Sequence, residues 1–240
     1  MRTPFLVGEK VYLSPVETED APRLAGWIND PAVSRTLRRK LPVTVAMEKA
    51  RIARMSNRED VLLLGVVERA TDELIGTTGF SQLDKKNGHA FIEMIIGAAS
   101  KWGRGYGYEA AVLLLDHAFQ TLRLNRVWVQ TFEFNQRVIR GCTRLGFRQE
   151  GALRQDIFRD GRYWDTLVFG LQREEWETSL SLPKLSNAWR KALSRGASAG
   201  RAARLKASPP ARSTGALIPC SLGCANTEAL IPSGSHRGAW

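Results

Sequence analysis

The sequence predicts an α+β fold built on a mixed central sheet. Three observations lead to this fold class. Two helical segments follow a first strand, strand-like segments joined by turns come next, and strand and helix then alternate up to residue 172. Strands joined by tight turns pair antiparallel, whereas strands separated by a helix can pair in parallel. We therefore expect a largely antiparallel sheet with a parallel junction near its middle, flanked by helices.

The N-terminal part is typical of one strand followed by two helices. Residues 10–16 (KVYLSPV) alternate apolar and polar positions, as a half-buried strand does. A helix over 18–30 begins at Thr or Asp, has Pro22 in its first turn and carries apolar residues at helical spacing. A second helix is expected over 44–60, where apolar residues recur three or four positions apart.

The remaining elements alternate in a regular order. Five further strands are expected at residues 61–68, 74–84, 89–98, 126–134 and 163–172. The first three are joined by polar turns and form a meander. A helix from the glycine-rich stretch near residue 104 to about residue 120 precedes the fourth strand. Another helix, over 135–147, has Asn135 as its N-cap and Gly146 at its C-terminal end.

The formal net charge of +11 is concentrated near the C-terminus. From Thr178 onward there are nine Lys or Arg residues and one acid, Glu228, which leaves +3 for residues 1–177. The same segment is rich in Ala, Ser, Gly and Pro, so it has little apolar surface to bury against its chain entropy. We expect residues 178–240 to form a basic, low-complexity, disordered tail. Its charge is suited to weak contact with RNA or the ribosome, or serves only solubility.

Composition also bounds the compartment and the metal chemistry. The longest apolar run, at residues 61–67, is too short to span a bilayer, and the first ten residues lack the apolar segment of a secretory signal. These observations predict a cytoplasmic protein with no membrane segment. The three cysteines form no disulfide framework, and the C-x3-C spacing of Cys220 and Cys224 is a weak metal signal. No metal site is predicted.

A glycine-rich stretch, KWGRGYGYEA at residues 101–110, opens the helix before the fourth of these strands. A P-loop requires Lys and then Ser or Thr after the last glycine, and a dinucleotide fingerprint requires G-x-G-x-x-G after a first strand. Neither pattern is present. Two interpretations remain: backbone amides presented to a diphosphate at a helix N-terminus, or an ordinary turn from strand to helix.

Four blocks of sequence resemble the GCN5-related N-acetyltransferases (GNAT), in the branch that includes ribosomal-protein N-terminal and spermidine acetyltransferases. In order, they are GEKVYLSPVETEDAPRLAGWINDP, WGRGYGYEA, FEFNQRVIRGCTRLGFRQEGALR and FRDGRYWDTLVFGLQREEW. The resemblance covers roughly residues 8–177. We therefore expect a GNAT domain over residues 1–177, with the tail over 178–240 outside it.

The resemblance implies the GNAT acyl-CoA N-acyltransferase fold, in which two neighbouring parallel strands splay apart and admit the pantetheine arm of acetyl-CoA. The residues expected to bind acetyl-CoA fall into three groups. The backbone of one strand would pair with the arm, the glycine loop would hold the diphosphate, and Asn135 would hydrogen-bond the arm unless it serves only as an N-cap. The first two groups are Met94, Ile95 and Ile96, and then Gly103, Arg104, Gly105, Tyr106, Gly107 and Tyr108.

Two positions depart from the family pattern. Trp102 stands where the loop usually begins with Gln or Arg, which loses one side-chain contact but keeps the backbone amides. Cys142 stands where the family commonly has a tyrosine that protonates the departing thiolate. Cys142 is therefore either the replacement acid or a small buried packing residue.

Glu93 is the candidate base. It is the lone charge in the apolar run AFIEMIIG, on the strand where relatives often place a carboxylate facing the cleft. Burial would raise its pKa toward the useful range, and the alternative is a carboxylate that faces solvent or forms an ion pair. The expected mechanism is direct attack of a neutral amine on the thioester, with the proton passing through water to Glu93.

These observations predict an acetyl-CoA-dependent N-acetyltransferase acting on a primary amine: a protein N-terminus, a polyamine, an amino acid or an amine-bearing antibiotic. Trp27 and Asn29 lie at a helix end that borders the acceptor groove in the family, with packing and turn formation as their alternative roles. The alternative function is a catalytically impaired acyl-CoA-binding protein whose basic tail associates with nucleic acid. The expected state is a monomer or a homodimer.

Overall fold

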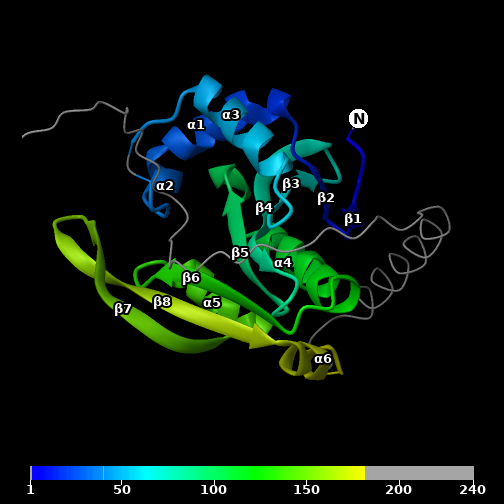
Figure 1. Ribbon diagram of the computed structural model, residues 1–240. Coiled ribbons are helices and arrows are strands. Elements are labelled where there is room, and N and C mark those ends of the chain that lie inside the picture. The colour runs from blue at the N-terminus through cyan, green and yellow to red at the C-terminus, as the bar shows by residue number, and fades with distance from the viewer. Residues whose placement is uncertain (1, 40, 182–240) are drawn as a thin grey trace, which may run out of the picture. The chain divides into compact units, whose positions relative to one another are not determined.

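The computed structural model describes residues 2–39 and 41–181 (Figure 1). Its centre is one eight-stranded sheet in the order β1-β2-β3-β4-β5-β6-β8-β7. All neighbouring strands pair antiparallel except β5 and β6, which confirms the predicted mixed sheet and its parallel junction. The strands are β1 (Leu6–Val7), β2 (Val11–Pro15), β3 (Leu62–Glu68), β4 (Glu73–Asp84), β5 (His89–Ile96), β6 (Arg126–Phe132), β7 (Arg148–Arg159) and β8 (Arg162–Gln172).

Helices cover both faces of this sheet. The α-helices are α1 (Ala21–Asn29), α2 (Pro31–Ser34), α3 (Val45–Ser56), α4 (Tyr106–Asp116), α5 (Gln136–Leu145) and α6 (Arg173–Ser181). Short helical turns lie at η1 (Thr18–Asp20), η2 (Ala99–Lys101) and η3 (His117–Thr121). The helices α1 and α3 pack together on one face (Figure 1), whereas α4 and α5 contribute apolar residues to the core on the other face.

Alternation along the strands divides the buried residues between two cores. In β2, Val11 and Leu13 belong to the larger core with α4, while Tyr12, between them, belongs to the smaller core with α1 and α3. The helix α4 is buried at every position from Glu109 to Leu115. A helix buried all round is fixed by its surroundings, so the loop that enters α4 has a rigid support.

The C-terminal boundary differs from the expectation. The sequence pattern does not predict α2 or α6, and α6 continues to Ser181, so the expected domain end at residue 177 falls inside a helix. Trp176 in α6 is 1% exposed and packs against Phe119. Of the predicted tail over 178–240, residues 178–181 belong to α6, and residues 182–240 lie outside the described residues.

Candidate active site

The strands β5 and β6 separate in the middle of the sheet. They pair over three positions, the last of which is Phe91 with Trp128. Beyond it, β5 still pairs with β4 up to Ile96, and β6 still pairs with β8 up to Phe132. The facing edges of β5 and β6 are thus open, while each strand remains ordered by its outer neighbour. This opening is the splayed junction that the resemblance implies.

The backbone of β5 presents alternate residues to this opening. The N–H of Gly97 donates to the carbonyl of Ile75 in β4 at 3.0 Å. Because the hydrogen-bonded pairs of an antiparallel ladder alternate, the N–H and C=O of Ile95 also face β4, and those of Met94 and Ile96 face β6. Of the three residues expected to pair with an arm, Met94 and Ile96 therefore face the opening and Ile95 does not.

The loop between β5 and α4 presents unpaired amides. Gly103 and Gly105 have φ values of 76° and 87°, a region that favours glycine, and Gly105 is the N-cap residue of α4. Among the described residues, the backbone N–H groups of residues 103–108 donate to no protein acceptor. Because the first amides of a helix lack intrahelical partners and lie at the positive end of its dipole, this loop is suited to an anion.

Three side chains fasten the loop to the sheet. Trp102, in the place of the usual Gln or Arg, donates from Nε1 to the carbonyl of Ile96 at 2.6 Å. Lys101 forms a 2.5 Å ion pair with Glu68, and the hydroxyl of Tyr106 donates to the same carboxylate. Hydrogen bonds from Lys101, Tyr106 and a threonine lower the pKa of Glu68 to about 2. The side chains of Lys101 and Tyr106 are thus used within the protein.

Asn135 lies at the N-terminus of α5, directly after the end of β6. Its backbone carbonyl accepts from Val138 and Ile139, but its side chain makes no capping hydrogen bond. Within residues 2–39 and 41–181, the side-chain amide of Asn135 has no hydrogen-bond partner. Asn135 is the N-cap residue of α5, as predicted, but its side chain does not supply the cap, so its amide group is available near the end of β6.

Cys142 lies inside the larger core. It is 6% exposed, and burial raises the pKa of its thiol to about 11. Its neighbours in this core include Leu145 and Phe147. This environment favours the packing role, and the role of Cys142 as an acid stays a prediction.

Glu93 is exposed on β5, so its expected burial is wrong. Alternation places its neighbour Ile92 in the core beside α4 and directs Glu93 to the opposite face. The hydroxyl of Ser81 in β4 donates to the Glu93 carboxylate at 2.7 Å. Glu93 therefore has a fixed partner and an open side toward solvent, and the solvent-facing alternative holds.

The end of α1 borders the end of β5. The ring of Trp27 packs against Gly97, where a Cβ atom would overlap it, so this contact requires glycine. Asn29 instead holds a neighbouring segment. Its side chain donates to the carbonyl of Val43 and accepts from the N–H of Val43, both at 2.8 Å. Trp27 thus walls the C-terminal end of β5, and Asn29 is engaged in a loop contact.

Two ion pairs, which the sequence analysis does not predict, join the segment after α1 to the β7–β8 hairpin. Arg38 pairs with Asp156, and Arg35 pairs with Asp160, both at 2.5 Å. The guanidinium of Arg38 also lies 5.9 Å from the ring centre of Phe132 at the end of β6. We call these two ion pairs the arginine–aspartate wall. The partners are more than a hundred residues apart, so no local sequence pattern indicates them.

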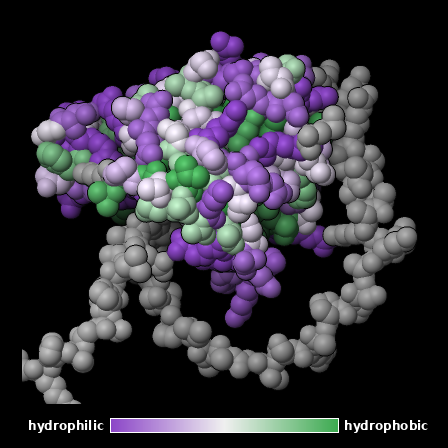
Figure 2. All heavy atoms as spheres, turned by 90° about the horizontal axis from the view of Figure 1, so that it is seen from above, coloured by the Kyte–Doolittle hydropathy of each residue, from purple (hydrophilic) through white to green (hydrophobic). Residues whose placement is uncertain are grey.

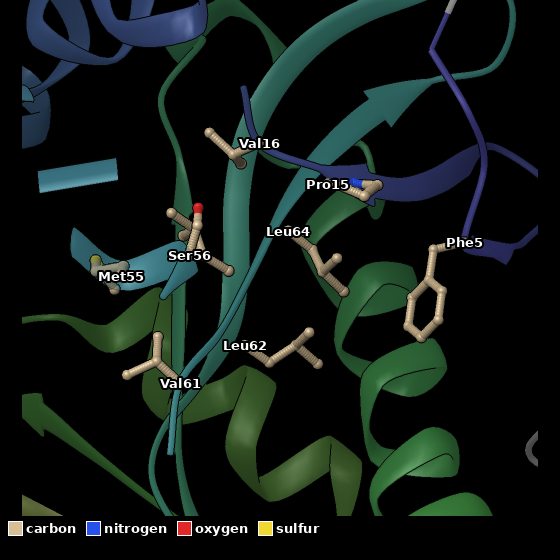
Figure 3. Close-up of a pocket in the computed structure, with 9 residues that line it drawn as sticks. Phe5, Pro15, Val16, Met55, Ser56, Val61, Leu62 and Leu64 are labelled. Atoms are coloured by element: carbon tan, nitrogen blue, oxygen red, sulfur yellow. The ribbon is translucent and has the colours of Figure 1, made fainter. Parts of the chain in front are cut away.

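A separate cavity of about 270 Å³ lies beside β2, β3 and α3, and not at the β5–β6 opening (Figure 3). Its lining contains no residue of the predicted site. The lining residues come from β2, α3, β3 and the segments next to β1, β2 and β3, and they are Phe5, Pro15, Val16, Met55, Ser56, Val61, Leu62, Leu63 and Leu64. Hence the predicted site is an opening between strands and not this apolar cavity.

The described part of the chain contains no cluster of His, Cys, Asp and Glu suited to a metal ion. Likewise, no helix within residues 2–39 and 41–181 has the length and apolar character needed to cross a membrane. On the face seen in Figure 2, hydrophilic residues predominate and apolar residues form separate patches.

The chain belongs to the GNAT acetyltransferase family, because the acetyltransferase (GNAT) domain matches residues 10–148. It is 33% identical over 177 residues to the N-acetyltransferase p20 of Bacillus licheniformis, covering 71% of this chain and 97% of p20. It is 27% identical over 114 residues to the [ribosomal protein uS5]-alanine N-acetyltransferase of Escherichia coli, covering 47% and 58%.

A solved structure has the same fold. Spermidine N-acetyltransferase from Vibrio cholerae, in complex with CoA and spermine, superposes with a TM-score of 0.65 at 18% identity. The match covers 70% of this chain and 98% of that one. At this identity the likeness establishes the fold alone. The family match and the named relatives make the chain an acetyltransferase.

Proposed function

We propose that this chain transfers the acetyl group of acetyl-CoA to a primary amine, directly and without an acyl-enzyme. The observation that carries the proposal is the open β5–β6 junction beside the loop of unpaired amides. A donor whose elongated arm connects a diphosphate to a thioester requires both features together. Acetyl-CoA supplies the acetyl group as a thioester, whose sulfur departs as a thiolate.

The residues present fit this donor in three places. The N–H and C=O groups of Met94 and the N–H of Ile96 would pair with the amides of its arm, as a neighbouring strand would, because the Ile96 carbonyl already accepts from Trp102. The amides of residues 103–108 would hold the diphosphate. The side chain of Asn135 would hydrogen-bond the arm on the β6 side. The backbone near Ile96 would also stabilise negative charge on the reacting carbonyl oxygen.

Glu93 would accept the proton that the amine loses. An alkylammonium with a pKa near 10.4 is neutral in only about one part in a few thousand at pH 7, so an acceptor for its proton assists the reaction. The carboxylate is exposed on the sheet face that carries α1, and the hydroxyl of Ser81 fixes its orientation. A water molecule between the amine and Glu93 would carry the proton.

We favour an acceptor with a single amine, such as a peptide N-terminus, over a polyamine. A polyamine is held by several unpaired carboxylates, but both aspartates of the arginine–aspartate wall are already paired with arginines. The E. coli relative acts on the alanine of a ribosomal protein, by its name, and the V. cholerae protein on spermidine. An amino acid is a further single-amine acceptor, and an amine-bearing antibiotic, which can carry several amines, is the remaining alternative.

The test is release of the CoA thiol from acetyl-CoA with a panel of amines that contains alanyl peptides, spermidine, amino acids and aminoglycosides. Release that requires an alanyl peptide supports the proposal, and release with spermidine alone contradicts the preferred acceptor. RNA retention on filters, with and without residues 182–240, tests the alternative function. Salt-sensitive retention that depends on those residues, with no amine-dependent thiol release, would favour the acyl-CoA-binding protein. The truncation follows Ser181 because an earlier cut would interrupt α6.

A further inference from the structure

The turn between β1 and β2 lies against the glycine loop, although 94 residues separate them in the sequence. The ammonium nitrogen of Lys10 lies 3.3 Å from the carbonyl oxygen of Arg104. It is also 3.9 Å from the position that a Cβ atom on Gly105 would occupy. Lys10 therefore lies at the rim of the loop whose amides have no protein acceptor.

A buried carboxylate holds Lys10 in this place. Glu109 in the first turn of α4 is 2% exposed, and its Oε1 accepts the backbone N–H groups of Lys10 and Val11 at 2.7 and 3.2 Å. Gly8 passes so close to the same oxygen that a Cβ atom there would overlap it. The β1–β2 turn is thus fixed to the N-terminus of α4, the helix that the loop opens.

The charge of Lys10 is not neutralised by the protein. Its side chain is exposed, and no ion pair involves it among the residues that the structure describes. Lys101, which lies in the loop by sequence, is instead paired with Glu68 at 2.5 Å. Of these two lysines beside the loop, the distant one therefore has the available charge. An ammonium group has three donors, and the Arg104 carbonyl uses one of them.

We propose that Lys10 binds a phosphate group of the acetyl donor, together with the amides of residues 103–108, and that Glu109 is its positioning residue. This inference rests on the proposed function. A cation beside a row of convergent N–H groups complements a diphosphate, and a charge-assisted hydrogen bond is stronger than a neutral one. The donor would then contact four parts of the chain: the N-terminal turn, the loop, β5 and Asn135 at the start of α5.

The test compares Lys10→Met with wild type, using CoA itself as the probe. By calorimetry, Lys10→Met is expected to raise the dissociation constant for CoA about tenfold, and the loss should shrink as the salt concentration rises. S-acetylpantetheine lacks the diphosphate, so kcat/KM for this donor should be the same in Lys10→Met and wild type. The matched control is Lys86→Met, an exposed lysine in the β4–β5 turn, which should bind CoA as wild type does.

The outcomes separate the two proposals. Equal CoA affinity in Lys10→Met and wild type overturns the role of Lys10 and leaves the acetyl donor site intact. An equal loss with CoA and with S-acetylpantetheine also overturns it, because the effect would then come from the fold and not from a phosphate. Absence of CoA binding by the wild-type chain overturns the proposed function as well. Lys10→Arg, which keeps the charge, should recover most of the lost affinity.

Discussion

At the scale of single residues, the Glu93 side chain is held by a hydrogen bond and exposed to solvent, and it is not buried. Its partner Ser81 lies on the adjacent strand at 2.7 Å, and the rest of its carboxylate is open to solvent. A base that faces an open cleft is accessible to water and to an incoming amine. The place of Glu93 at the site stays a prediction, while the burial that the surrounding apolar run indicates is wrong.

Glu93→Gln is expected to lower kcat/KM for the amine by about 10- to 100-fold, because the amide cannot accept the proton. The KM for acetyl-CoA should change little. The measurement is kcat/KM for the amine as a function of pH, in the variant and in wild type. Glu177→Gln, on the exposed side of α6, is the control. An unchanged pH profile in Glu93→Gln would remove this residue from the reaction.

Cys142→Ala distinguishes the acid from the packing residue. Because the thiol is buried and its pKa is raised to about 11, we expect turnover within about twofold of wild type. Loss of the buried sulfur should lower the free energy of unfolding by about 1 kcal/mol. Steady-state kinetics and denaturant unfolding measure the two effects. A large fall in turnover at unchanged stability would instead assign the acid role to Cys142.

The candidate site was partly predictable because its chemistry is carried by backbone. The glycines at 103 and 105 have the positive φ values that only glycine adopts readily, so the sequence indicates them directly. Contacts between residues that are far apart in the sequence produce no comparable sequence pattern. Neither the Lys10–Arg104 contact nor the arginine–aspartate wall follows from any spacing, since each depends on how the strands pair.

At the scale of elements, α4 connects the loop, the core and the N-terminal turn. Its first turn carries Glu109, which holds the β1–β2 turn, and its last residue is Asp116. Burial alone raises the pKa of Asp116 to about 6 from its usual 3.8. Asp116 therefore destabilises the folded chain whenever it is ionised.

Because Asp116 destabilises the folded chain only when it is ionised, we expect the free energy of unfolding to depend on pH. A raised pKa contributes stability that is present below pH 3.8 and is lost as the pH rises through about 6. Asp116→Asn is therefore expected to raise the free energy of unfolding by about 1–2 kcal/mol at pH 8 and to change it little at pH 4. Denaturant unfolding at the two pH values measures this difference. An equal effect at both would exclude ionisation as its cause.

Helices and strands with a strong hydrophobic period were predictable from the sequence. A very short helix, and a helix held in place by a tertiary contact, were not. The strands β2 to β6 and the helices α1, α3, α4 and α5 follow from alternation, helical spacing and glycine or proline positions. The helix α2 has four residues, too few for a period to be visible. The helix α6 is held by one buried residue, Trp176, whose contact with Phe119 depends on the completed fold.

At the scale of the whole molecule, the sheet consists of two antiparallel parts, β1 to β5 and β6 with β8 and β7, joined by three paired positions between β5 and β6. A donor seated in the opening would contact both parts. At a CoA concentration 100 times its dissociation constant, the free energy of unfolding should rise by about 2.7 kcal/mol. Thermal unfolding with increasing CoA measures this effect, and no shift would contradict binding at the opening.

The short pairing between β5 and β6 also has a consequence for the rate of amide hydrogen exchange. Because only three residue pairs join β5 to β6, we expect the two antiparallel parts of the sheet to move relative to each other without unfolding. Because the backbone N–H groups of Met94 and Ile96 have no strand partner, they should exchange their hydrogens with solvent rapidly, while the amides that pair β5 with β4 remain protected.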